Sequence, residues 1–228
     1  MDRGLYIAAS GMLAELARQD QLTNDLANSD TAGYKADRVT QTSFGDVLLH
    51  NTRTGAEVGP MGQGVSLGRS QTDTTPEALK QTDEPLDVGI DGDGWFAVQT
   101  AEGRQYTRNG AFTADAGGRL VDQMGNAVLG QDGRPVQVGA DGKVDVARIG
   151  VFALGAVRKE GDGYVTGATA STPVGKARTG YLEGSGVDPT RTVVDLMASL
   201  RAYEAGQKAL TTIDDSLRQA NRITNAAG

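Results

Sequence analysis

Apolar residues near the N-terminus recur at the three- and four-residue spacing of an amphipathic helix. The pattern predicts a helix from Arg3 to Ala27, about 37 Å long at 1.5 Å per residue. The residues Asn28-Ser29-Asp30 then form a stop signal, with Gly33 just beyond it. The predicted apolar face consists of Leu5, Met12, Leu16, Leu22 and Leu26. This face is narrow and has Gln19 as a polar interruption, so it needs a partner.

Residues 189–228 repeat the helical pattern more clearly, with Pro189 near the predicted helix start. Residues 186–228 carry five basic and five acidic side chains, and mixed signs beside a narrow apolar face are typical of helix-to-helix packing. The predicted apolar face consists of Val193, Leu196, Leu200, Tyr203, Leu210, Ile213 and Leu217.

Between the two predicted helices the hydrophobic period changes from about 3.6 to 2, as in Leu86–Ile90, Trp95–Val98 and Val144–Val146. Turn pairs of the Asp-Gly, Asn-Gly and Gly-Gly types separate these segments and explain much of the 32 glycines. Residues 85–185 are therefore predicted to form a domain of short antiparallel strands. The polar residues 36–84 are predicted to be an extended connector with one short element at Phe44–His50.

The predicted fold class is α+β, with long N- and C-terminal helices that form a coiled-coil-like pair and a central all-β domain of short antiparallel strands. Residues 1–35 and 186–228 would form a discontinuous helical assembly domain, and residues 85–185 an outer β-rich domain. The alternative is that both helices pack inside one ordinary monomer, as a helical hairpin beside the sheet. The narrow faces at opposite chain ends favour bundles of several helices, hence assembly between subunits.

Composition excludes several classes of function. With no cysteine and one histidine, the chain has no disulfide, thiolate zinc site or cysteine nucleophile. The net charge of −7 argues against binding to nucleic acid or anionic lipid. We also expect no membrane span and no signal peptide, because the N-terminal apolar run is short and polar residues follow from Glu15. Composition alone thus indicates a cytoplasmic protein by default.

The sequence gives little support for a metal, nucleotide or catalytic site. Asp91 and Asp93 alternate with glycine as in a calcium loop, but the later ligands of an EF-hand are missing, so a hairpin turn is the preferred interpretation. The glycines at positions 62, 64 and 68 miss the dinucleotide spacing, and His50 lies in a polar stretch without a nucleophile elbow. We therefore expect no cofactor, no metal, no catalytic residue and no small-molecule substrate.

The run from Leu26 to Lys35, Leu-Ala-Asn-Ser-Asp-Thr-Ala-Gly-Tyr-Lys, resembles the N-terminal signature of bacterial flagellar rod and hook proteins. In that family a helix ends at Leu-Ala-Asn and the chain continues through Thr-x-Gly-Tyr/Phe-Lys. Further segments that are similar to the family are Gly4–Met12, Pro85–Phe96, Tyr106–Gly110, Gly180–Ser185 and Arg201–Ala205. The resemblance therefore covers most of the chain.

The resemblance implies a non-enzymatic axial subunit of the flagellar basal-body rod, of the proximal or distal type. It also implies export through the flagellar type III export apparatus without a cleaved signal peptide, and a position outside the cytoplasmic membrane, which overrules the cytoplasmic default. The implied partners are copies of the chain and other rod and hook proteins, and the two terminal helices would polymerise into part of a drive shaft for motility.

The family-motif residues that the resemblance singles out are Asn28, Thr31, Gly33, Tyr34 and Lys35. They are expected to shape the exit from the first helix, with Gly33 supplying a flexible φ and Lys35 a charge near the helix C-terminus. The alternative for Tyr34 and Lys35 is a simple surface pair. The chain departs from the family pattern at Gly186-Val187 and at Gly206, which lies inside the second predicted helix.

Two alternative functions remain open. The first is a hook-type axial protein of the same family. The second is a secreted cell-wall glycan-acting enzyme, for which Asp87, Asp91 and Asp93 are the conspicuous carboxylates. A peptide-binding adaptor that uses an open strand edge is a third class.

Overall fold

The computed structural model describes residues 2–43, 46–50, 57–62, 64–161, 163–170 and 175–226. The chain divides into two compact units. The helical unit contains Met1–Leu26, Asp37–Gln71 and Pro189–Gly228. The β-rich unit contains Ala27–Ala36 and Thr72–Asp188.

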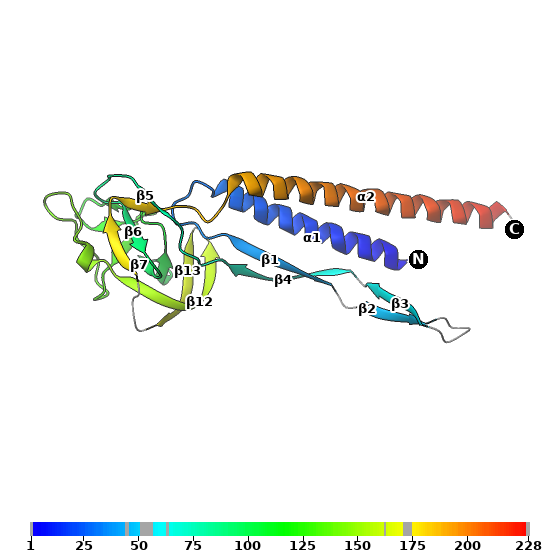
Figure 1. Cartoon of the computed structure of the whole chain (residues 1–228), viewed down its shortest axis with the longest axis horizontal. Coiled ribbons are helices and arrows are strands. Elements are labelled where there is room, and N and C mark those ends of the chain that lie inside the picture. The colour runs from blue at the N-terminus through cyan, green and yellow to red at the C-terminus, as the bar shows by residue number, and fades with distance from the viewer. Residues whose placement is uncertain are drawn as a thin grey trace. The chain divides into compact units, whose positions relative to one another are not determined.

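Two long α-helices dominate the helical unit (Figure 1). Helix α1 spans Asp2–Ala27 and helix α2 spans Pro189–Ala226, close to the bounds that the sequence predicts. They lie side by side in opposite directions, because the Ser199 hydroxyl donates to Glu15 Oε2 at 2.6 Å while Gly4 lies against Ile213. Ser199 is 1% exposed, so this polar contact is inside the pair.

The predicted coiled-coil-like pairing of the two helices is wrong. The contact sets glycines of one helix against large side chains of the other: Gly4 lies against Ile213, and a Cβ added at Gly206 would lie 2.8 Å from Met12 Cγ. Two leucines that a knobs-into-holes seam would bury remain outside, with Leu16 45% exposed and Leu200 44% exposed. Small residues allow close approach but supply no knobs, which is why the leucine spacing does not produce a coiled coil here.

Paired strands occupy part of the polar stretch for which the sequence predicts an extended connector. In the helical unit, β1 pairs with β4, and β2 pairs antiparallel with β3 (Figure 1). These strands span Asp37–Ser43 (β1), Asp46–His50 (β2), Glu57–Gly62 (β3) and Val65–Thr72 (β4). Of the element expected at Phe44–His50, Phe44 lies outside the described residues, and His50 ends β2.

The β-rich unit is built on a seven-stranded sheet of order β12-β13-β8-β7-β11-β10-β9. Strand β12 pairs with β13 along most of its length and with β7 at its start, so β12, β13, β8 and β7 close a ring. The strands span Trp95–Thr100 (β7), Gly103–Thr107 (β8), Thr113–Ala114 (β9), Leu120–Val121 (β10), Ala127–Leu129 (β11), Val151–Gly161 (β12) and Tyr164–Ala170 (β13).

Strand β7 is buried on both faces, which explains its continuous apolar run. Phe96 and Val98 belong to one core cluster, while Trp95 and Ala97 belong to another. Phe96 also stacks edge to face on Phe112, with ring centroids 5.2 Å apart. The β-rich unit therefore has two hydrophobic cores, and β7 contributes side chains to both.

Two short strand pairs in the β-rich unit carry the chain toward α2. Strand β6 (Val88–Asp91) pairs antiparallel with β14 (Lys176–Thr179), and β5 (Leu79–Gln81) pairs antiparallel with β15 (Tyr181–Glu183). The central region is not entirely β, because a 3₁₀ turn, η1, spans Val146–Arg148 and includes the last residue of the predicted strand Val144–Val146. Val144 itself forms an isolated β-bridge with Val138. Asp145 caps that turn by accepting from the Ala147 N–H.

Candidate functional site

The chain makes a sharp turn directly after α1. The Thr31 N–H donates to the Asn28 carbonyl at 3.1 Å, and Gly33 then takes a positive φ of 65°. A Cβ added at Gly33 would lie 2.3 Å from the Arg108 carbonyl carbon, so both the backbone conformation and the space require glycine. The Gly33 N–H donates to the Glu183 carbonyl at 2.9 Å. This turn sets Lys35 against the interior of the β-rich unit.

A buried ionic cluster lies beneath this turn. Glu183, the last residue of β15, accepts from Lys35 Nζ at 2.6 Å, from Arg108 Nη1 at 2.8 Å and from the Glu77 N–H at 2.9 Å. The side chains of Lys35, Arg108 and Glu183 are each no more than 3% exposed. Lys35 Nζ also donates to the Thr75 carbonyl at 2.5 Å. We call Lys35, Arg108 and Glu183 the Glu183 cluster.

Arg108 is held on more than one side. Its Nη2 donates to the Gly92 carbonyl at 3.1 Å, and its guanidinium lies 5.5 Å from the centroid of the Trp95 ring. Removing charges from water is costly, and the interior compensates for it only where ion pairs and hydrogen bonds are both present. The Glu183 cluster contains two cations, Lys35 and Arg108, and one carboxylate. Glu183 attracts both cations, but its charge balances only one of them.

Backbone contacts join the same segments. The Gly186 N–H donates to the Tyr34 carbonyl and the Ser185 hydroxyl to the Asn28 carbonyl, both at 2.9 Å. Lys159 Nζ lies 4.1 Å from the centroid of the buried Tyr34 ring. The residues that follow α1 and those that precede α2 are therefore bound to each other as well as to the sheet.

Among the family-motif residues, Lys35 has a different setting from the one expected. Tyr34 and Lys35 are both buried, so they are not a surface pair, and the charge of Lys35 is bound by Glu183. Arg108 lies in the segment Tyr106–Gly110 and Glu183 in Gly180–Ser185, and sequence reasoning gives neither a role. Each is the single charged residue of its segment, which is the signal that could have identified it.

The predicted assembly residues lie along α1 and α2. Leu16 and Leu200 are exposed, and the others are only partly buried: Leu5, Met12, Leu22, Leu26, Val193, Leu196, Tyr203, Leu210, Ile213 and Leu217. On these two helices, full burial among the described side chains is limited to Ala14, Asp25, Thr192 and Ser199. The helical apolar faces are therefore incompletely covered within one chain.

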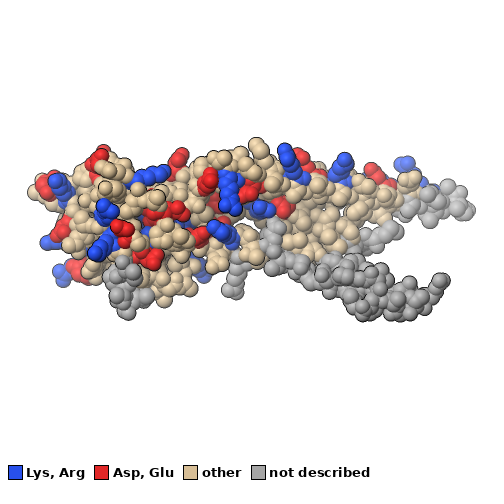
Figure 2. Space-filling view, in the orientation of Figure 1, with Lys and Arg blue, Asp and Glu red and all other residues tan. Residues whose placement is uncertain are grey.

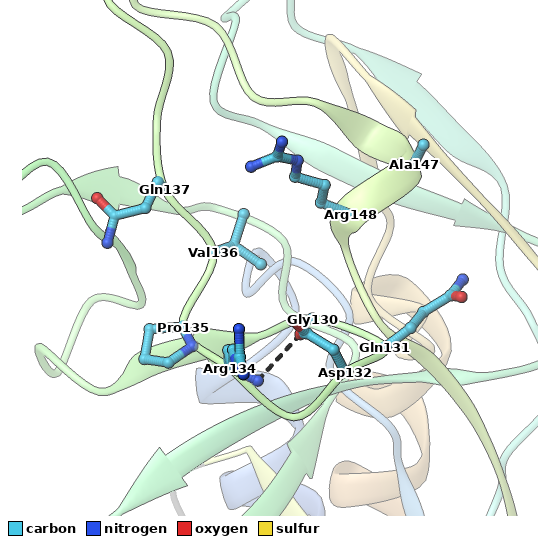
Figure 3. A pocket seen from close by; sticks show the side chains of 9 residues that line it. All are labelled: Gly130, Gln131, Asp132, Arg134, Pro135, Val136, Gln137, Ala147 and Arg148. Atoms are coloured by element: carbon cyan, nitrogen blue, oxygen red, sulfur yellow. Dashed lines mark hydrogen bonds between the residues drawn. The ribbon is translucent and has the colours of Figure 1, made fainter.

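Of the three conspicuous carboxylates, Asp87 is half-buried in an isolated β-bridge with Ala111, and the other two are exposed. Asp91 lies 3.5 Å from Arg178 Nη1 and is mostly exposed, and Asp93 lies in an exposed turn. Nine residues from 130 to 148 surround a hollow of about 410 Å³, where the Arg134 N–H donates to Asp132 (Figure 3). The Arg148 side chain at this hollow is 71% exposed, so these polar groups remain in water.

In the part of the chain that the structure describes, no three His, Cys, Asp or Glu side chains gather closely enough to hold a metal ion. None of the described helices is long and apolar enough to cross a membrane. The Glu183 cluster has a structural role, because its charged atoms hold chain segments together. These atoms are buried, so a substrate cannot reach them.

Three family models match separate parts of the chain. "Flagella basal body rod protein" matches residues 5–35, "Flagellar hook protein FlgE/F/G D1 domain" matches residues 89–158, and "Flagellar basal body rod FlgEFG protein C-terminal" matches residues 178–223. Lys35, Arg108 and Glu183 fall one in each matched range. The cluster therefore joins all three matched parts of the chain.

Curated relatives extend the match over nearly the whole chain. The flagellar basal-body rod protein FlgG of Bacillus subtilis is 31% identical, covering 96% of this chain and 98% of its own. FlgF of Escherichia coli is 30% identical over 98% of both chains, and FlgF of Caulobacter vibrioides is 32% identical over 96% and 97%. This chain therefore belongs to the family of flagellar basal-body rod proteins, which are structural components of the flagellar basal body.

Proposed function

We propose that this chain is an axial rod subunit that polymerises through α1 and α2 to form part of the drive shaft for motility. The observation that carries the proposal is the exposure of large apolar side chains on both helices. On α1, Tyr6 is 61% and Leu13 66% exposed; on α2, Val194 is 60% and Met197 55% exposed. Several large apolar side chains exposed on one helix pair suit contacts with other proteins.

A hollow of about 440 Å³ in the helical unit supports the proposal. It is lined mainly by small residues of α1 and α2, among them Gly4, Ala8, Gly11, Ala202 and Gly206. Large exposed side chains and a small-residue hollow on the same helix pair suit a heterologous contact between copies. Such a contact, repeated without closing, builds an open filament.

The charges on α2 are compatible with close packing between copies. Acidic and basic side chains alternate along the helix (Figure 2), with Arg218 Nε 3.0 Å from Asp214 and Arg191 Nε 4.0 Å from Asp195. Because charges of opposite sign are paired within one helix, neighbouring copies would not face a surface of a single sign.

We also propose that the subunit acts outside the cytoplasmic membrane, after export by the flagellar type III apparatus without a cleaved signal peptide. Its neighbours would be copies of itself and other rod and hook proteins. The names of the relatives and the sequence resemblance support this setting. A hook-type subunit is the alternative, since one matched model also describes hook proteins. Immunogold labelling of isolated hook-basal bodies distinguishes rod from hook.

The test of polymerisation places a charge on the exposed apolar surface. Leu200→Asp should abolish assembly of the purified full chain and motility in a strain that depends on it, because a carboxylate cannot be buried there unpaired. Thr211→Asp adds the same charge at an exposed polar position of α2 and should leave both intact. Sedimentation velocity over a concentration series and swimming assays read the result. Unchanged assembly by Leu200→Asp would refute the proposal.

A further inference from the structure

The segments next to the two helices differ in what holds them. The C-terminal segment, residues 176–188, contains strands β14 and β15, which pair with β6 and β5. The N-terminal segment, residues 27–36, contains no strand. Gly33, Tyr34 and Asn28 are hydrogen-bonded to the C-terminal segment, while the carbonyls of Lys35 and Ala36 accept from Lys159 Nζ and from the Asp73 N–H, both at 2.9 Å. The C-terminal segment therefore has strand pairings of its own, whereas the N-terminal segment has none and makes three of its hydrogen bonds with the C-terminal segment.

From this asymmetry we infer that the two segments dock onto the β-rich unit in a fixed order, set by Glu183. The C-terminal segment docks first and brings Glu183 to Arg108. The N-terminal segment docks second and adds Lys35. The inference rests on the geometry of the Glu183 cluster and does not depend on polymerisation.

The charge balance gives the physical reason. If the N-terminal segment leaves, Arg108 and Glu183 remain as a neutral pair, and the Glu77 N–H still donates to Glu183. If Glu183 leaves, Lys35 and Arg108 remain as two buried cations without a counter-charge. Like charges in a buried site oppose each other strongly, so the N-terminal segment would be expelled.

The order has a consequence for the helices. Residues 27–36 continue directly from α1, and residues 176–188 lead directly into α2. The chain beyond α1 would therefore become fixed only after the residues that precede α2 are in place. Docking of the C-terminal segment therefore controls docking of the N-terminal segment through the Glu183 carboxylate, and the reverse does not hold.

Hydrogen exchange measured by mass spectrometry on the full chain tests the order. In Glu183→Gln, the amides of residues 27–36 should exchange about a hundredfold faster, or more, than in the wild type. The amides of β14 and β15 should change by less than about threefold, because their strand pairing persists. Equal protection of residues 27–36 in both proteins would overturn the inference.

A second substitution separates charge from packing. Adding Lys35→Met to Glu183→Gln should restore most of the protection of residues 27–36, because one of the two unbalanced cations is gone. Lys80→Met, at an exposed lysine of β5, is the matched control and should restore nothing. Further loss of protection in the Lys35→Met double variant would overturn the inference.

The single variant Lys35→Met tests the other direction and does not require Glu183→Gln to fold. It leaves the Arg108–Glu183 pair neutral, so the C-terminal segment should keep wild-type protection. Faster exchange of β14 and β15 in Lys35→Met would show that the C-terminal segment depends on the N-terminal one, and would overturn the order.

Discussion

Lys35 and Glu183 are separated by 148 residues in the sequence, yet Lys35 Nζ and Glu183 Oε1 lie 2.6 Å apart in a buried site. The first residue closely follows α1, and the second closely precedes α2. The pair therefore closes a loop that contains the whole seven-stranded sheet. Together with the Arg108–Glu183 pair, this contact joins the residues that follow α1, those that precede α2 and the segment that contains Arg108, and its loss should affect all three.

Substitutions in the Glu183 cluster should differ in cost according to the charge that they leave behind. Glu183→Gln leaves two unbalanced cations and should lower the free energy of unfolding by about 3–5 kcal/mol. Lys35→Met and Arg108→Met should each cost less, because each leaves one neutral ion pair. Trp95 is the chain's single tryptophan and lies against Arg108, so its fluorescence during urea unfolding reports the effect. An equal cost for all three variants would contradict this ranking.

Two glycines should respond oppositely to the same substitution. Gly33→Ala should destabilise the protein by about 1–3 kcal/mol, because φ is positive there and the new Cβ meets the Arg108 backbone. Gly11→Ala is the control: nothing lies within 4 Å of its Cβ, and alanine is preferred inside a helix by up to about 1 kcal/mol. Thermal unfolding of both variants measures the difference. A stable Gly33→Ala variant would show that the turn can relax.

Local patterns were sufficient to predict the two helices. The predicted first helix, residues 3–27, corresponds to α1 at Asp2–Ala27, and Pro189 begins α2 as expected from its fixed φ. The apolar run at Trp95–Val98, for which the sequence predicts a strand, likewise corresponds to β7. Each of these elements is determined by residues that are neighbours along the chain, so the sequence contains the necessary information.

The Glu183 cluster could not be predicted in the same way. The sequence places Lys35 near a helix end, whereas its partner Glu183 is 148 residues away. The leucine spacing also misled, because it describes which residues share a helix face and not which residues touch another helix. In the structure, Gly206 and Ser199 make the contact between α1 and α2. Long-range pairing is decided by the folded topology, which local periodicity does not specify.

Gly206 should be required for the close approach of the helices. Gly206→Leu should lower the melting temperature of the helical signal and cost about 1–3 kcal/mol, because a side chain there meets Met12. Adding Met12→Ala should recover part of the loss by making room. Ala205→Leu, at the exposed neighbouring position, is the control and should be nearly neutral. Circular dichroism of the full chain measures all three, and equal effects at positions 205 and 206 would contradict the contact.

Asp115 should give the β-rich unit an acid-sensitive contribution to stability. Its carboxylate accepts from the Arg119 N–H at 2.9 Å, from Arg119 Nε at 2.8 Å and from the Gly117 N–H at 2.8 Å. The Arg119 backbone N–H, followed by the Arg119 side chain, holds the pKa of Asp115 below its ordinary value. The contribution is therefore present above the ordinary carboxyl pKa and is lost as the pH falls through the lowered one.

Asp115→Asn checks this pH dependence. Its urea midpoint should lie below that of the wild type at neutral pH, and the two midpoints should converge in acid as Asp115 of the wild type becomes protonated. The pH at which they converge reports the pKa in the folded protein. A difference that stays constant down to strongly acidic pH would show that the carboxylate charge has no part in it.

The bounds of the β-rich unit make a final prediction about fragments. A fragment of residues 72–188 should fold alone, because it contains both cores and the neutral Arg108–Glu183 pair. A fragment of residues 85–185 should be less stable, although it has the same seven-stranded sheet. It lacks β5, which pairs with β15, and the Glu77 N–H, which donates to Glu183.

The expected difference between the two fragments is a few kcal/mol, from a lost strand pairing and a buried carboxylate that loses one hydrogen bond. Urea unfolding followed by Trp95 fluorescence measures it in both, since each contains that residue. Glu183→Gln should then destabilise the longer fragment more than the shorter one, because only the longer fragment holds Glu183 in its full set of contacts. Equal unfolding midpoints for the two fragments would place the boundary of the folding unit at residue 85 and leave residues 72–84 as a passive connector.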